Sequence, residues 1–142
     1  ALLGALVFGY VQDRIGHKMA LAITLVGWSI TCVLAALTSS KEVFWWAAAL
    51  AGVCMGSSQS TGRAMAGLFI PSHRLAEFFG LWTFAIRLAS IVGPLGYGLI
   101  TWITAGNQRL AIGATAVLFL IGLALLLPIN VQRGQIKAQT QA

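Results

Sequence analysis

Polar side chains that could bind a solute lie inside otherwise apolar stretches of this sequence. Arg87 lies in the apolar stretch 78–103, and Gln59 and Arg63 lie in the stretch 43–70. A guanidinium group presents a planar set of N–H donors that matches a carboxylate or a phosphate. Charged side chains are costly in apolar surroundings, so a functional role is the first hypothesis for them. The pattern indicates a site that recognises a polar or anionic group.

Helical spacing gathers these polar residues on one face of each stretch. At about 100° per residue, the face of 43–70 holds Gly52, Gly56, Gln59, Ser60, Arg63 and Gly67, and the face of 78–103 holds Gly80, Thr83, Arg87, Ser90, Pro94, Gly98 and Thr101. We predict that Gln59, Ser60, Arg63, Arg87 and Ser90 line a cavity. The alternative for either arginine is a structural role, with the guanidinium reaching to the membrane surface.

The small residues on the same faces predict other roles. Gly52 and Gly56, with Ser60, form a small-x-x-x-small pattern, which favours close helix packing. Gly93 and Pro94 together predict a kink in the stretch 78–103.

Arg87 has no acidic residue nearby in the sequence. It lies nine residues after Phe78, roughly 14 Å along a helix, and so near the middle of a hydrocarbon core of about 30 Å. The three acidic residues of the chain, Asp13, Glu42 and Glu77, lie in loops or at the edges of apolar stretches. We therefore expect Arg87 to meet water, the rest of the protein or an anionic group of the solute.

Composition indicates the environment in which these groups act. Of the 142 residues, 58% are hydrophobic and 8% are charged, whereas a soluble domain carries about 25% charged residues. The sequence thus predicts an all-α integral membrane protein, a polytopic helical bundle in the lipid bilayer. Its basic residues do not cluster, so we expect no nucleic-acid partner.

The apolar stretches divide the chain into four full spans and part of a fifth. The predicted spans are 19–37, 43–70, 78–103 and 108–129, preceded by the end of a span at 1–11 and followed by a polar tail at 130–142. Because 1–11 is too short to cross a bilayer, we expect an N-terminal part to be missing.

The basic residues between the spans predict the orientation. One side has Arg14, Lys18, Arg74, Arg133 and Lys137, and the other has Lys41 and Arg109. Since the cytoplasmic side carries the excess, the segment 12–18 and the tail are predicted to be cytoplasmic.

The segment between the first two apolar stretches has a specific pattern. It reads G-x-x-x-D-R-x-G-x-K, formed by Gly9, Asp13, Arg14, Gly16 and Lys18. Gly9 would allow a neighbouring helix to approach closely, and Gly16 would allow a tight turn. Asp13 could face a helix N-terminus, while Arg14 and Lys18 could hold the loop at an anionic membrane surface.

This pattern resembles the signature loop of the major facilitator superfamily. The segments 56–63, 68–71, 76–81 and 91–95, which include Ala-Glu-Phe-Phe-Gly at 76–80, resemble the branch that contains fungal vacuolar, autophagy-related amino-acid exporters and uncharacterised bacterial relatives. The resemblance implies a partial major-facilitator fold, the C-terminal half, whose partner is the missing N-terminal half. It also implies that Asp13 stabilises one conformational state by meeting a helix N-terminus in the opposite half.

The resulting hypothesis is a secondary transporter half that moves a small polar solute, plausibly an amino acid, by alternating access. A bacterial inner membrane is the expected location. The alternatives are a four-helix small carrier acting as a dimer and a non-transporting membrane assembly subunit; such carriers usually have an acidic residue within a span, and this chain has none. We expect no enzyme, metal or cofactor, because the sequence contains no nucleophile–base pair, Cys/His metal spacing or phosphate loop. Cys32 and Cys54 are predicted to be buried, without a disulfide.

Overall fold

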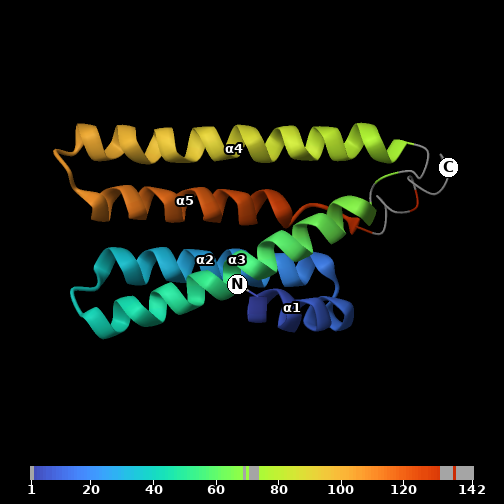
Figure 1. The fold of residues 1–142 in the computed structure, drawn as a ribbon, viewed down its shortest axis with the longest axis horizontal. Helices are drawn as coiled ribbons and strands as arrows, with labels where there is room; N and C mark the ends of the chain where they lie inside the picture. Colours follow the sequence, from blue (N-terminus) through green and yellow to red (C-terminus); the bar gives the residue numbers. More distant parts are fainter. Residues whose placement is uncertain (1, 69, 71–73, 132–135, 137–142) are drawn as a thin grey trace.

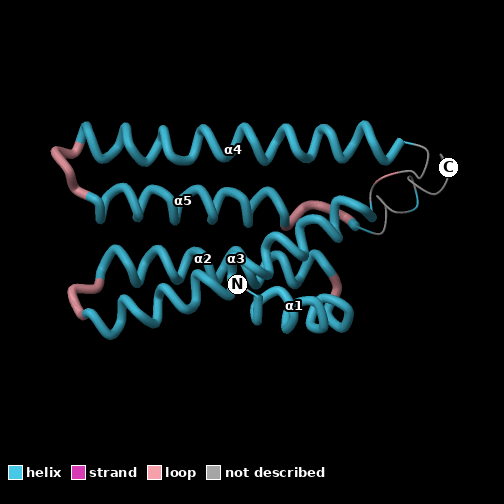
Figure 2. Tube along the Cα trace, in the orientation of Figure 1, coloured by secondary structure: helices cyan, strands magenta, loops and turns pink. Residues whose placement is uncertain are grey.

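Five α-helices make up the computed structural model, which describes residues 2–68, 70, 74–131 and 136. They are α1 (Leu2–Ile15), α2 (His17–Leu37), α3 (Lys41–Leu68), α4 (Leu75–Ile103) and α5 (Gln108–Leu126). Figure 2 shows helices joined by short loops and no strand in this part of the chain. The all-helical prediction is confirmed. The segment 71–73 and most of the predicted tail, including Arg133 and Lys137, lie outside the described residues.

The helices form an elongated bundle with α2 at its centre (Figure 1). The most extensive contacts of α2 are with α3 and α5, and α1 packs mainly on α3. α4 runs along one edge of the bundle, where it contacts α5 and only barely touches α3. No residue of α4 is buried. One long side of α4 is thus open within the described part of the chain.

The bundle core is built from small side chains, several of them polar. Thr24 of α2 and Ser57 and Thr61 of α3 are almost completely buried. The Thr24 hydroxyl lies 2.9 Å from the Ala20 carbonyl and 3.3 Å from the Ser57 hydroxyl, which links α2 to α3. Small and hydroxylated residues are typical of membrane helix interfaces, where backbones approach closely and hydrogen bonds cross between helices.

α2 approaches α3 closely at Gly27. A Cβ placed on Gly27 would lie 2.6 Å from Cys54 Sγ, which is too close for two such atoms. Cys54 is 4% exposed, and Cys32 is also buried; both thiols are free. The prediction of buried cysteines without a disulfide is confirmed.

Three helices are long and apolar enough to cross a membrane: α2, α4 and α5. α3 has 28 residues but falls short in hydropathy, because the segment from Ser57 to Arg63 is polar. A fourth full span at α3 stays a prediction. α5 ends at Leu126, three residues before the expected boundary, and Pro128 follows its C-cap, where a proline cannot continue the helix.

The prediction of a loop at 12–18 is wrong, because Gly16 is the only residue between α1 and α2. The Gly16 N–H donates to the Gln12 carbonyl at 2.9 Å, and its carbonyl accepts from the Ala20 N–H at 3.0 Å, so helical bonding continues almost unbroken. Gly16 has φ 86°, a conformation that glycine adopts without the cost of a side chain. The charged residues of the pattern therefore belong to helix ends.

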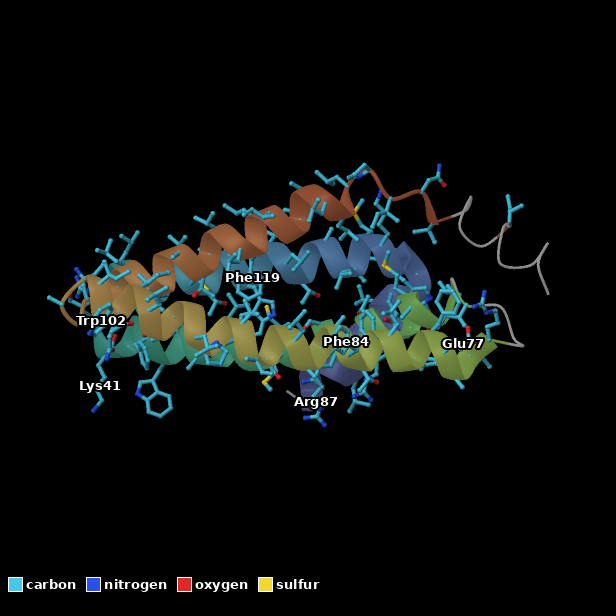
Figure 3. All side chains as sticks on the ribbon, turned by 90° about the horizontal axis from the view of Figure 1, so that it is seen from above. Lys41, Glu77, Phe84, Arg87, Trp102 and Phe119 are labelled. Atoms are coloured by element: carbon cyan, nitrogen blue, oxygen red, sulfur yellow. The ribbon has the colours of Figure 1, made fainter. Side chains whose placement is uncertain are left out.

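Exposed tryptophans lie at the end of the bundle opposite to the α1–α2 junction at Gly16. Trp45 and Trp46 lie near the start of α3, and Trp102 lies near the end of α4. Figure 3 places Trp102 and Lys41 together at this end, with Glu77 at the far end of α4. Tryptophans at this level are typical of a membrane–water interface.

Candidate functional site

Two adjoining polar hollows lie between α3 and α4. The first, of about 360 Å³, is lined by Arg63, Phe79, Trp82, Thr83, Ile86, Arg87 and Ser90. The second, of about 280 Å³, is lined by Ser58, Gln59, Arg63, Trp82 and Ile86. Together they contain four of the five predicted cavity residues: Gln59, Arg63, Arg87 and Ser90. Ser60 is half-buried and is not among the residues that line these two hollows.

Helical spacing explains why these side chains meet. Gln59 and Arg63 are one turn apart on α3, and Thr83 and Arg87 are one turn apart on α4. Arg87 is twelve residues after the first residue of α4, or about 18 Å along its axis. The hollow is therefore near mid-length on α4, between the ends marked by Glu77 and Trp102 in Figure 3.

Neither Arg63 nor Arg87 forms a side-chain hydrogen bond or ion pair within the described part of the chain. The ion pair found there joins Arg74 to Glu77 at 2.6 Å, on the exposed first turn of α4. In Figure 3 the Arg87 side chain points away from α5. The Thr83 and Ser90 hydroxyls donate to backbone carbonyls of their own helix, at 2.8 and 2.7 Å. The two guanidinium groups are the charged donors available to a solute.

Trp82 is the residue of this site that the sequence analysis missed. Between Leu75 and Leu95 of α4, Trp82 is the one half-buried residue, and the others are exposed. Its ring rests on Gly62 of α3, where an added Cβ would lie 3.3 Å from Trp82 Cη2. The indole Nε1 is buried and has no partner among the described residues. The sequence could have indicated Trp82, because this tryptophan is well inside a predicted span and away from the membrane interface, where tryptophans are common.

An apolar hollow of about 460 Å³ lies on the other side of Trp82, toward the Gly16 end. It is lined by Leu21, Gly62, Met65, Ala66, Ile70, Phe78, Leu81, Trp82, Ala85, Leu126 and Ile129. Because Trp82 lines this hollow and both polar ones, its ring separates an apolar space from a polar one. The described residues that line the apolar hollow carry no charge, so they offer no partner to an ionised solute.

The residues of the signature pattern occupy the junction of α1 and α2. Arg14 donates to the Tyr10 hydroxyl and lies 4.8 Å from the centre of that ring. Lys18 Nζ donates to the Leu127 carbonyl at 2.5 Å and so caps the C-terminal end of α5. Asp13, in the last turn of α1, is exposed and forms no hydrogen bond or ion pair within the described part of the chain.

The close approach predicted at Gly9 is not seen among the described residues. A Cβ placed on Gly9 would meet no atom within 4 Å, so no described helix makes the predicted close approach there. Close contacts of α3 are seen where Cys54 meets Gly27 of α2 and where Gly62 meets Trp82 of α4. Gly52 and Gly56 are half-buried, and their packing role stays a prediction.

α4 continues through Gly93 and Pro94 as one helix. No sharp bend is visible at its middle in Figures 1 and 3. A kink or hinge at this position stays a prediction.

Comparison with known proteins identifies the family. The sequence profile described as "Vacuole effluxer Atg22 like" matches residues 1–139, almost the whole chain. The chain belongs to the Atg22-like family. The predicted branch of the major facilitator superfamily is therefore confirmed. The relatives of this Atg22-like chain include proteins named as transporters.

Individual relatives of the Atg22-like chain come from bacteria and fungi. The uncharacterized MFS-type transporter YxiO of Bacillus subtilis is 29% identical over 86% of this chain and 28% of its own length. Autophagy-related protein 22 of Candida glabrata is 32% identical over 62% of this chain and 16% of its own length. A triacylglyceride transporter of Mycolicibacterium hassiacum is 26% identical over 68% of this chain and 18% of its own length. The chain thus spans less than a third of each of these relatives, and no solved structure matches it significantly.

Proposed function

We propose that this Atg22-like chain is the C-terminal part of a secondary transporter that moves a small polar solute by alternating access. The observation that carries the proposal is the hollow between α3 and α4, which contains Arg63 and Arg87 without a partner in the described part of the chain. An anionic group of the solute, such as the carboxylate of an amino acid, would bind the Arg87 guanidinium through paired hydrogen bonds. The open side of α4 would face the remainder of the protein, across the solute path.

The complete protein in proteoliposomes tests this proposal. We expect saturable uptake of at least one carboxylated solute. A complete absence of saturable uptake across amino acids and simple carboxylates would contradict the proposal.

The family membership favours this function over the two alternatives. A four-helix carrier acting as a dimer has no support from the relatives, which are several times longer than this chain. An assembly subunit without transport activity would leave the two arginines of the hollow without a role. Such a subunit would also be expected to show no saturable uptake.

The orientation proposal places the Gly16 end of the bundle in the cytoplasm of a bacterial inner membrane. It rests on the basic residues, of which Arg14, Lys18 and Arg74 lie at this end and Lys41 and Arg109 lie at the other. In a background with Cys32 and Cys54 replaced by alanine, we expect a cysteine at Ala76 to react with a membrane-impermeant maleimide only in inverted vesicles. A cysteine at Ser40 should react only in intact cells. The reverse pattern would show that the orientation is wrong.

Asp13 is proposed to stabilise one state of the transport cycle through a contact outside this bundle. An acidic side chain in the last turn of a helix is unfavourable by about 0.3–1 kcal/mol, because that end of the helix dipole is negative. Asp13 is in the last turn of α1 and forms no ion pair among the described residues. A contact elsewhere in the protein would compensate for this position.

Asp13→Asn should therefore slow turnover in the complete protein without lowering its stability. Uptake rates and melting temperature, measured at matched incorporation, check this prediction. The matched control is Glu42→Gln, which removes a negative charge at the end of the bundle opposite to Asp13. It should leave turnover unchanged. Equal uptake by Asp13→Asn and wild type would show that Asp13 has no role in the transport cycle. The G-x-x-x-D-R-x-G-x-K pattern would then indicate only the orientation of the chain.

A further inference from the structure

The larger of the two polar hollows between α3 and α4 is lined by two positively charged side chains and by no negatively charged residue of this chain. Arg63 comes from α3 and Arg87 from α4, and both line the same space of about 360 Å³. The chain has three acidic residues in all. Asp13 is at the end of α1, Glu42 in the first turn of α3 and Glu77 in the first turn of α4, where it binds Arg74. Two positive charges thus face one hollow without a negative one.

Two guanidinium groups that line one hollow repel each other. A bound anion would relieve it. A solute with one negative charge would neutralise one guanidinium and leave the other uncompensated. A solute with two negative charges would neutralise both.

The hydrogen-bond donors of the hollow come from its two arginines. The Thr83 and Ser90 hydroxyl protons are already used by backbone carbonyls. These two hydroxyls therefore offer a solute only acceptors, and the donors at the hollow are the guanidinium groups of Arg63 and Arg87. The oxygens of a carboxylate or a phosphate can accept hydrogen bonds from both guanidinium groups. Binding pockets for small molecules have volumes of about 300–1,000 Å³, so this hollow suits a small solute.

We infer that the hollow binds a dianionic solute, with two negative charges shared between Arg63 and Arg87. This inference rests on the proposed transport function and narrows its solute class. It makes a dicarboxylate or a phosphate a better ligand than a neutral amino acid, whose single carboxylate is accompanied by an ammonium group that no residue lining the hollow in this chain could pair with.

A matched pair of probes tests the inference. Succinate has two carboxylates, and succinamate replaces one of them with an amide of nearly the same shape. Binding to the complete protein in nanodiscs is measured by calorimetry. Wild type should bind succinate at least about tenfold more tightly than succinamate, the effect of one charge-assisted hydrogen bond. Inorganic phosphate in a parallel titration shows whether the dianion is a dicarboxylate or a phosphate.

Variants of Arg63 link the preference to the hollow. Arg63→Gln should reduce the preference for succinate to less than about threefold while succinamate still binds through Arg87. Arg63→Lys keeps the charge and should keep most of the preference. Arg109→Gln removes a charge at the other end of the bundle, where Arg109 donates to Ser39 at 2.9 Å, and should keep the wild-type ratio.

The possible failures are distinguishable. Equal binding of succinate and succinamate by wild type, with both weakened by Arg87→Gln, would overturn the dianion inference and leave the proposed anion site intact. An unchanged preference in Arg63→Gln would also overturn it. If neither succinate, succinamate nor phosphate binds, both the inference and the anion site fail.

Discussion

Replacing Arg87 with glutamine is expected to weaken solute binding about ten- to hundred-fold, since a charge-assisted hydrogen bond contributes roughly 1.5–3 kcal/mol. Arg87 lies near mid-length on α4 and lines the hollow without a partner in the described part of the chain. Arg87→Lys should also lower uptake, although less, because an ammonium group is a point charge and cannot form the paired bonds of a guanidinium. Uptake by the complete protein in proteoliposomes, with the apparent affinity taken from its concentration dependence, measures both effects.

The control for Arg87 is Arg109→Gln, which removes the same charge from the opposite end of the bundle. It should insert and transport as wild type does. All three variants must be compared at equal incorporation, with circular dichroism to verify their helix content. If Arg87→Gln retains wild-type uptake across a range of carboxylated solutes, Arg87 has a structural role and the site assignment is wrong.

Gly27→Ala should destabilise the bundle by about 1–3 kcal/mol relative to the same change at Gly122, the usual cost of overpacking a close-packed interior. The added Cβ at Gly27 would lie 2.6 Å from Cys54 Sγ, whereas an added Cβ at Gly122 would meet no atom within 4 Å. Both glycines are inside helices, so the gain in helix propensity on changing glycine to alanine, up to about 1 kcal/mol, cancels in the comparison. Apparent free energies of unfolding in mixed detergent micelles measure the difference.

Cys54→Ala tests the physical cause of the Gly27 effect. It removes the sulfur that the new methyl group would meet, so the double variant should recover most of the lost stability. This recovery separates a local clash from a general effect on α2. If Gly27→Ala and Gly122→Ala are equally stable, the close approach of α2 and α3 does not exist in the membrane.

Much of the candidate site could be predicted from helical periodicity. Gln59 and Arg63 are spaced by one turn, as are Thr83 and Arg87, and a helix must place such pairs on one face. The hollows between α3 and α4 contain these residues. Ser60, at the edge of a predicted face about 100° wide, is not among the residues that line the two hollows.

The sequence by itself determined the membrane class, the all-helical fold, the family and the polar faces of two helices. The membrane class, the helices and the polar faces follow from composition and helical period, which are local along the chain, and the family follows from the resemblance of its motifs. Only the tertiary structure decided that Arg63 and Arg87 share one hollow, that Trp82 rests on Gly62 beside them, and that Lys18 caps α5. Each of these contacts joins residues of different helices, and which helices become neighbours depends on the packing of the whole bundle. It also decided that the signature segment is a one-residue junction at Gly16, because the hydrogen bonds of the two flanking helices extend to meet there.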